Sequence, residues 1–397
     1  MTKKLTFLFA ILFSFFCGVT KSQAIKLSDS ADISILTNSP WTGAVYGLFG
    51  HASIRVKDPV RHLDFVFNYG MFSFQKPNFI YHFAKGETDY MVVPIPYAEF
   101  IVEYQEKGLE VNEQVIRLSS KDKQKVWDAL CMNVLPENRE YRYNFFFDNC
   151  ATRPFDIIEK NISGKIVLPD GKNNPTFRNL LNEFLEGNDW TQFGINLVIG
   201  ASADHPVTEK EKIFLPKYLH EILSKSAIRD SMGIEQPLVK SENRLNNKED
   251  QPRESSLWPP WLAGLLLFLI ASILSYWQWQ TGRSSSLTKL FDFMLFAISG
   301  AAGVVMTFLM FFSVHPCMFP NWNYVWLHPL HLFAACLFYV KRCTKFIYYY
   351  HFINFALLTV FLLAWKLIPQ ELEWSFLPFV GTLWLRSLIG AFAVPKK

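Results

Sequence analysis

Five long apolar segments after residue 258 constrain this chain more than any other feature. They cover roughly 259–278, 289–313, 325–340, 346–366 and 376–394. Each is close to the length that an α-helix needs to cross the hydrocarbon of a bilayer. The preceding residues have the mixed polar and apolar patterning of a soluble domain. The sequence therefore predicts an all-α transmembrane domain with five helices over 258–397, preceded by a large water-exposed part.

The N-terminus and the loops predict an orientation. Two lysines, an apolar run and then Ser22-Gln23-Ala24 are typical of a cleaved signal peptide, residues 1–24. The first and third loops and the chain end carry lysine or arginine, whereas the second loop, HPCMFPNWNY, carries neither. By the positive-inside rule, we expect the basic loops and the C-terminus in the cytoplasm and the soluble part outside.

Residues 25–233 have the size of one globular domain. The runs GHASIRV and DFVFNYG predict successive strands, and KDPVR between them has the composition of a turn. Helices are expected around these strands without regular βαβ alternation, which indicates an α+β fold. The polar, charged residues 234–257 are interpreted as a linker, to which PLV could add a short strand.

One cysteine stands where a helix should begin. In NFFFDNCATRPFD, Asp148 and Asn149 are N-cap residues and Pro154 suits only a first turn, so the helix starts near Cys150. A thiol there faces the positive end of the helix dipole, which favours the thiolate, and unpaired N–H groups could stabilise an oxyanion. Two alternatives remain open: a buried structural cysteine, or a disulfide to Cys131.

The histidine best placed to act as a base is His51, which follows a glycine at the start of a strand. The next strand offers Asp64 to hold the imidazole, with Asn68 on the same face as a substitute. We therefore predict a triad of Cys150, His51 and Asp64, although each residue could also be purely structural. The sequence contains no metal-binding, P-loop or Rossmann pattern. We therefore expect no metal and no cofactor. The formal net charge is only +4, so we also expect no nucleic-acid partner.

Three separated blocks carry a resemblance to a known family. GHASIRVKDP, then FVFNYGMF with NFIYHFAKG, then NREYRYNFFFDNCATRPFD resemble the exported domain of Lnb-type lipoprotein N-acyltransferases. This sequence departs from the family's Asn-Cys-Thr motif, because Ala151 follows the cysteine and Thr152 comes next. The resemblance covers most of residues 25–230 and implies a permuted papain-like fold of the NlpC/P60 type. It implies His51 as base and Cys150 as nucleophile, with Asp64 or His62 as the third group.

The resemblance also implies an activity. It points to an enzyme of the bacterial inner membrane that moves an acyl chain from a phospholipid, through a cysteine thioester, to the N-terminal amine of a diacylglyceryl-cysteine lipoprotein. The residues expected to contact substrate are Asn149, Asn68, Tyr69 and Arg153. Two other functions stay open: a membrane-anchored cysteine peptidase or amidase acting on cell-wall peptides, and a non-enzymatic envelope scaffold.

Polar residues in the apolar part of the chain need a separate explanation. Asn321, His328 and His331 lie around the second outer loop and the third apolar segment, where polar groups usually face a cavity or a partner helix. We interpret the aromatic residues beside them as interfacial anchors. Arg386 in the last segment is expected to be paired or to reach the interface.

Overall fold

The computed structural model describes residues 25–392 apart from 73–74, 76, 172–173 and 249–255. The expected signal peptide lies outside these described residues. The chain divides into two compact units. We call Met1–Pro175 with Pro206–Arg253 the sheet unit, and Thr176–His205 with Glu254–Lys397 the helical unit.

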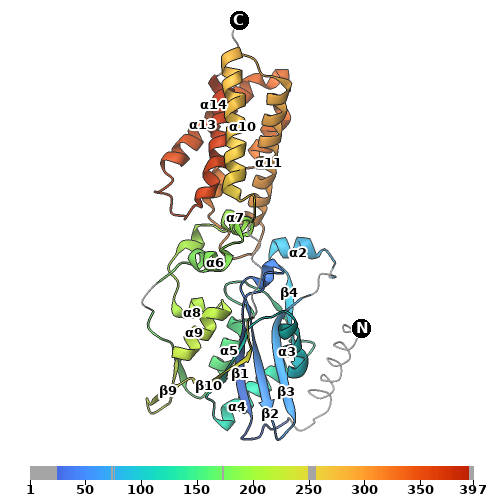
Figure 1. The fold of residues 1–397 in the computed structure, drawn as a ribbon, viewed down its shortest axis with the longest axis vertical. Coiled ribbons are helices and arrows are strands. Elements are labelled where there is room, and N and C mark those ends of the chain that lie inside the picture. The colour runs from blue at the N-terminus through green and yellow to red at the C-terminus, as the bar shows by residue number, and fades with distance from the viewer. Residues whose placement is uncertain (1–24, 73–74, 76, 172–173, 249–255, 393–397) are drawn as a thin grey trace. The chain divides into compact units, whose positions relative to one another are not determined.

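An antiparallel seven-stranded sheet forms the centre of the sheet unit (Figure 1). Its strand order is β10-β5-β1-β2-β3-β4-β6, and β7, β8 and β9 form a second, three-stranded sheet. The strands are β1 (Asp32–Asn38), β2 (His51–Asp58), β3 (Leu63–Met71), β4 (Asp89–Pro96), β5 (Val111–Ile116), β6 (Glu140–Arg142), β7 (Lys165–Val167), β8 (Ala227–Arg229), β9 (Glu235–Pro237) and β10 (Val239–Asn246).

Helices pack on both faces of the large sheet. On one face, Ile54 and Phe67 of the sheet pack with Trp127 of α4; on the other, Leu36 and Val66 pack with Phe100 of α3 and its neighbours. The predicted α+β content is confirmed, whereas the permuted papain-like arrangement stays a prediction. The helices are η1 (Val45–Gly47), α2 (Phe79–Lys85), α3 (Tyr97–Glu106), α4 (Ser120–Asn133), α5 (Thr152–Asn161), α8 (Glu209–Lys212) and α9 (Pro216–Lys225).

The segment expected to be a linker is partly folded. Residues 235–246 form β9 and β10, and β10 adds an edge strand to the large sheet by pairing with β5. Most side chains of β10 are exposed, and an edge strand of this kind is held by backbone hydrogen bonds rather than by apolar burial. Its polar composition therefore resembled that of a tether.

Among the residues that the structure describes, the helical unit contains four helices long and apolar enough to cross a membrane: Pro260–Thr281, Ser286–Phe311, Lys341–Leu363 and Trp374–Phe392. Five transmembrane helices stay a prediction, and the segment 325–340 is not one continuous long helix. Pro329 lacks an N–H group and restricts the residue before it, so the helix there is only Leu330–Leu337, about 12 Å long. The elements are α6 (Phe177–Leu185), α7 (Asp189–Val198), η2 (Ala201–Asp204), α10 (Pro260–Thr281), α11 (Ser286–Phe311), η3 (Trp322–Val325), α12 (Leu330–Leu337), η4 (Lys341–Cys343), α13 (Thr344–Leu363), η5 (Trp374–Phe376) and α14 (Leu377–Phe392).

Close contacts and a buried ion pair hold these helices together. A Cβ atom on Gly300 of α11 would lie 2.1 Å from the backbone nitrogen of Leu332, so the small residue lets α12 approach its neighbour closely. Arg386 of α14 bonds both carboxylate oxygens of Asp292 at 2.6 and 2.8 Å. The expectation that Arg386 is paired is confirmed.

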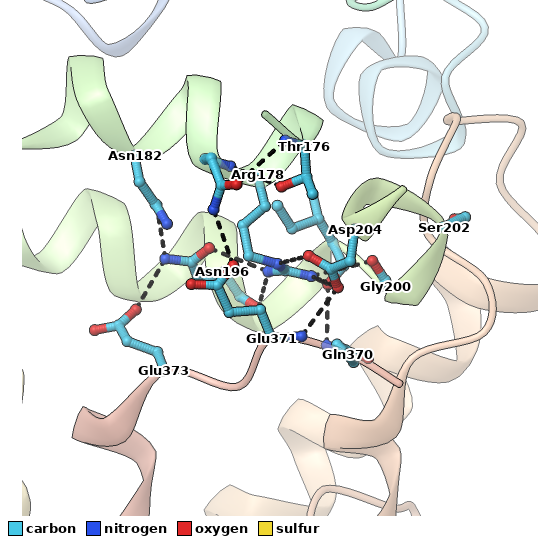
Figure 2. A network of polar contacts seen from close by, with 12 residues as sticks. Thr176, Arg178, Asn182, Asn196, Gly200, Ser202, Asp204, Gln370, Glu371 and Glu373 are labelled. Carbon is cyan, nitrogen blue, oxygen red and sulfur yellow. Dashed lines mark hydrogen bonds and ion pairs between the residues drawn. The ribbon is translucent and has the colours of Figure 1, made fainter. Parts of the chain in front are cut away.

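The segment Thr176–His205 belongs to the helical unit, whereas the sequence placed it in the exported domain. Its Arg178 is 1% exposed and donates to both oxygens of Asp204, at 2.6 and 3.1 Å, as Figure 2 shows. Asn196 donates to Glu373 at 3.0 Å, and the backbone N–H of Glu371 donates to Asp204 at 3.1 Å. These bonds join α6, α7 and η2 to the loop before α14, which accounts for the changed boundary.

Candidate functional site

Cys150 and His51 meet at one end of the large sheet. The two side chains are hydrogen-bonded to each other, although His51 begins β2 and Cys150 precedes α5. Gly70 at the end of β3 lies against both: a Cβ atom there would be 3.5 Å from Cβ of Cys150 and 3.9 Å from Cε1 of His51. Cys150 is a free thiol, so the alternative of a disulfide to Cys131 is excluded.

A glycine is required directly before His51. Gly50 has a φ of +78°, and a Cβ atom on it would lie 2.6 Å from the carbonyl oxygen of Asn38. Asn38 is also the partner of His51 in the β1–β2 ladder. Only a residue without a side chain allows the chain to turn into β2 this close to β1, and this turn sets where the imidazole emerges.

Asn149 holds the turn that presents Cys150. Its amide nitrogen donates to the carbonyl oxygens of Phe145 and Phe214, both at 2.8 Å, and its amide oxygen accepts from the N–H groups of Ala151 and Thr152 at 2.8 and 3.0 Å. The side chain is 2% exposed. Asn149 therefore holds the turn before α5 from within the domain, and its contact with substrate stays a prediction.

Thr152 completes the same turn. Its hydroxyl oxygen accepts from the backbone N–H of Asn149 at 2.8 Å. The hydroxyl group in this turn therefore comes from Thr152, one residue later than in the Asn-Cys-Thr motif. Because Asn149 occupies the N–H groups of Ala151 and Thr152, these groups are not open to an oxyanion as the sequence suggested. The N–H groups that lie at the Cys150 sulfur are its own and that of Ala52.

The electrostatics of the site favour an ion pair between thiolate and imidazolium. Burial alone would raise the pKa of Cys150, but the nearby positive charge of His51, its hydrogen bond and the two backbone N–H groups lower that pKa overall. Burial would likewise lower the pKa of His51, but the Cys150 charge and hydrogen bond, together with Asn68, raise it. Each partner thus stabilises the charged form of the other.

The side chain that orients His51 is Asn68, not Asp64. Oδ1 of Asn68 lies 2.5 Å from Nε2 of His51. Since an amide oxygen can only accept, Nε2 carries the proton and Nδ1 is left for the thiol. Asn68 is 6% exposed, so this contact is shielded from water. The substitute that the sequence offered as the third residue therefore occupies the predicted position.

Strand register explains why Asp64 is wrongly placed in the predicted triad. β2 and β3 are antiparallel, and Asp64 pairs with Lys57, six residues beyond His51 along β2, which is about 20 Å. Both carboxylate oxygens of Asp64 instead accept from Arg55 at 2.7 Å. His62, the other third-residue candidate, lies in the turn just before β3 at the same far end.

Two further predicted substrate contacts have other partners. Tyr69 is fully buried in the core under α4, and its hydroxyl accepts from Asn133 at 3.0 Å. Burial raises the pKa of Tyr69 to about 12. Arg153 forms a two-point ion pair with Asp148 at 2.6 and 2.7 Å and stacks over the Tyr141 ring. Alternation puts Tyr69 on the sheet face opposite Asn68, and Arg153 anchors the turn before α5.

A row of stacked aromatic rings leads away from the thiol. Tyr143 and Cys150 pack against the same core cluster. Tyr143 stacks on Tyr90 with ring centroids 4.1 Å apart, and Tyr90 stacks on Phe72 at 4.8 Å. Phe72 in turn stacks on Phe79 of α2 at 5.9 Å. The sequence indicated the stretch from Phe72 onward but missed Tyr90 and Tyr143, since they come from β4 and from the segment after β6.

The surface at the end of this row is apolar. The α2 helix exposes 83% of Ile80, 52% of Tyr81 and 51% of Phe83. A contiguous exposed aromatic and aliphatic surface commonly marks a place where a lipid or another protein binds. Cys150 and an apolar surface thus lie within one unit.

Comparison with known families identifies both parts of the chain. The Lnb N-terminal periplasmic domain matches residues 22–183, and the Lnb transmembrane domain matches residues 252–397. No curated protein and no solved structure matches the chain. The expected resemblance is therefore confirmed, and with it a periplasmic domain joined to a transmembrane helical domain.

Proposed function

The chain belongs to the Lnb family, and from this premise we propose that it is a lipoprotein N-acyltransferase whose nucleophile is Cys150. The observation that carries the proposal is the continuous chain of contacts from Asn68 through His51 to Cys150. A nucleophile, a base and a group that orients the base are what covalent acyl transfer requires. Asn68 takes the third role that the sequence assigned to Asp64.

In the first half-reaction, the Cys150 thiolate attacks the carbonyl carbon of a phospholipid ester. The negative charge moves to the carbonyl oxygen, and we propose that the backbone N–H of Cys150, which lies at the sulfur, then donates to that oxygen. When the C–O bond breaks, the imidazolium of His51 gives its Nδ1 proton to the departing glycerol oxygen. A lysophospholipid leaves, and the acyl chain stays on Cys150 as a thioester.

In the second half-reaction, the amine of a diacylglyceryl-cysteine attacks the thioester carbon. Neutral His51 accepts a proton from the amine, the C–S bond breaks, and the thiolate of Cys150 is restored. The product carries a third acyl chain through an amide bond. The aromatic row from Tyr143 to Phe79 and the exposed apolar side chains of α2 support this proposal over a peptidase, because an apolar surface suits the acyl chain of a lipid.

We place this reaction on the periplasmic face of the inner membrane, with the C-terminus in the cytoplasm. The broken segment after η3 supports five passages, because it follows α11 from one end to the other. Thr307 donates to the Tyr324 hydroxyl at 3.0 Å, and Tyr339 donates to the carbonyl of Lys289 at 2.6 Å. Together with four long helices, such a path would bring the two chain ends of the transmembrane domain to opposite sides, which supports the proposed orientation.

Mass spectrometry of the N-terminal lipopeptide of an abundant lipoprotein tests this function. Cells carrying the wild-type protein, Cys150→Ala or no protein are compared in a background without another N-acyltransferase. We expect the third acyl chain with the wild type alone. Equal N-acylation in all three strains would refute the acyltransferase and favour a peptidase or amidase.

A further inference from the structure

The helical unit contains a large apolar groove that the chemistry at Cys150 does not use. Its volume is about 1020 Å³, and it lies between η3 with α12 on one side and α13 on the other. Small-molecule sites usually measure roughly 300–1,000 Å³, so this groove is large enough for a lipid with more than one chain. Several lining residues are exposed, including Phe333 at 55% and Ile353 at 62%, so the groove is open along one side.

One face of α13 forms the floor of the groove. The residues Phe346, Tyr349, Tyr350, Ile353, Asn354 and Leu357 line it and recur at helical spacing, so they form a single stripe. Asn321 and Trp322 line the end nearest the loop before α14, where Gln370 accepts from the backbone N–H of Trp322 at 2.8 Å. The groove therefore runs along the bundle from its loop end toward the start of α13.

Two buried polar atoms interrupt the apolar lining. His328 and Asn354 are neighbours in the wall of the groove. Apart from the contact between these two side chains themselves, Nδ1 of His328 and Oδ1 of Asn354 have no hydrogen-bond partner among the residues that the structure describes, and Nδ2 of Asn354 already donates to Ser387. In hydrocarbon, an unsatisfied polar atom costs free energy. Such atoms in a cavity wall therefore indicate a ligand that supplies the missing partners.

The lining selects among membrane lipids. It contains no lysine, arginine, aspartate or glutamate, and a phosphate group is usually met by basic side chains or helix N-termini. Oδ1 of Asn354 can only accept, so its partner must donate a hydrogen bond. The diacylglyceryl-cysteine end of a lipoprotein has two acyl chains, no phosphate at the glyceryl group, and N–H donors close to it.

We infer that this groove binds the diacylglyceryl anchor of the acceptor lipoprotein, with His328 and Asn354 beside its linkage region. The inference rests on the proposed function and assigns the acceptor to a site in the helical unit, separate from the thiol. The two acyl chains lie along the α13 stripe, and the cysteine end of the lipopeptide lies toward Asn321 and Trp322. The phospholipid donor does not need this groove.

Filling the groove with a bulky side chain tests the inference, and the chain offers a matched control. Ile353 of α13 lines the groove, whereas Ile298 of α11 does not; both are 62% exposed. Full-length protein with Ile353→Trp or Ile298→Trp is placed in nanodiscs. Each variant is also made with Cys150→Ala, so that binding is measured without turnover. The probes are a synthetic diacylglyceryl-cysteine lipopeptide and a phosphatidylethanolamine, each with a photoactivatable acyl chain.

We expect the lipopeptide to label α12 and α13 saturably. Ile353→Trp should reduce this labelling about tenfold or more, equivalent to roughly 1.4 kcal/mol, and Ile298→Trp should leave it unchanged. With Cys150 present, Ile353→Trp should leave acylation of the thiol by phospholipid intact and slow transfer to the lipopeptide. Equal lipopeptide labelling in both tryptophan variants would overturn the inference. Saturable phospholipid labelling that Ile353→Trp abolishes, with loss of thiol acylation, would also overturn it.

These outcomes are separable from failure of the proposed function. If Cys150 is not the nucleophile, N-acylation persists in Cys150→Ala whatever the groove binds. If the groove is not the acceptor site, thiol acylation and N-acylation persist in Ile353→Trp at wild-type rates. Labelling reports on the groove, and acylation of the thiol reports on the nucleophile.

Discussion

The two ends of the β2–β3 hairpin are built from opposite kinds of polar group. At the end where β2 begins, a neutral amide, Asn68, holds His51 against Cys150. At the other end, Arg55 is 4% exposed and is fixed by two carboxylates, Asp64 and Glu113. One hairpin thus carries a titratable pair at one end and a permanently charged network at the other.

The two ends of the hairpin are suited to different roles because their polar groups differ in charge. Arg55 stays charged at any physiological pH, so its network with Asp64 and Glu113 stabilises the fold without exchanging protons. An amide partner fixes the orientation of His51 without adding a formal charge, so the protonation of His51 is governed mainly by Cys150. Proton transfer therefore belongs to the Asn68 end, and substitutions at the two ends should separate activity from stability.

Cys150→Ala should have the largest effect on activity. Without the thiol no thioester can form, so we expect at least about a 10³-fold loss of N-acylation, as for other nucleophile deletions. The free energy of unfolding of the full-length protein should change little, since only one sulfur atom is removed. Radiolabelled acyl transfer and thermal unfolding are the two measurements, and retained transfer would exclude Cys150 as the nucleophile.

His51→Ala should cost nearly as much, and the double variant with Cys150→Ala should be no worse than either single variant, because the pair acts as one unit. Alkylation by iodoacetamide adds a second readout. It requires the thiolate, so its rate rises as the pH passes through the pKa of Cys150, which His51 lowers. His51→Ala should move this rise to higher pH, and an unchanged pH profile would contradict the ion pair.

Asn68→Ala should reduce acyl transfer by about 10- to 100-fold, the usual loss when a group that orients a reactive side chain is removed. Its matched control is Asp64→Ala on the same strand and the same face. Asp64→Ala should leave the rate constant of acyl transfer unchanged and lower the free energy of unfolding by roughly 1–3 kcal/mol, because Arg55 loses a partner. If Asp64→Ala lost activity and Asn68→Ala did not, the assignment of the two ends would be reversed.

Gly70→Ala should have the smallest effect of the series. The φ of +91° at Gly70 is strained for alanine and costs about 1–2 kcal/mol. The new methyl group would sit at ordinary contact distance from Cys150, 3.5 Å from its Cβ. We expect a modest loss of both stability and transfer rate, measured as above, whereas Gly233→Ala, with open space around it and a φ of +84°, should lose stability alone.

Local sequence signals were sufficient to predict that Cys150 and His51 lie in one site. Gly50 marks the start of a strand and Asn149 marks the turn before a helix, and both are signals of backbone geometry. The residues that follow them, His51 and Cys150, are found at these two positions. The third residue required more: strand alternation gives the face of a side chain but not its register. Asp64 and Asn68 share a face, and only the pairing of β2 with β3 distinguishes them.

The differences between the predicted domain boundaries and the two compact units have a similar origin. Composition indicated a linker where β10 is an edge strand, because backbone pairing leaves little trace in side chains. It likewise assigned Thr176–His205 to the exported domain, since the bonds from Arg178 and Asn196 connect residues far apart in sequence. Hydropathy predicted a fifth continuous helix over 325–340, although Pro329 within it already argued against one.

The most direct test of the central claim is the intact mass of the purified protein after incubation with phospholipid and no acceptor. We expect an increase of one acyl chain on the peptide that contains Cys150, its release by hydroxylamine, and its transfer when a diacylglyceryl lipopeptide is added. The adduct should be absent from Cys150→Ala. N-acylation of the lipopeptide by a protein that never carries an acyl chain on Cys150 would contradict the account.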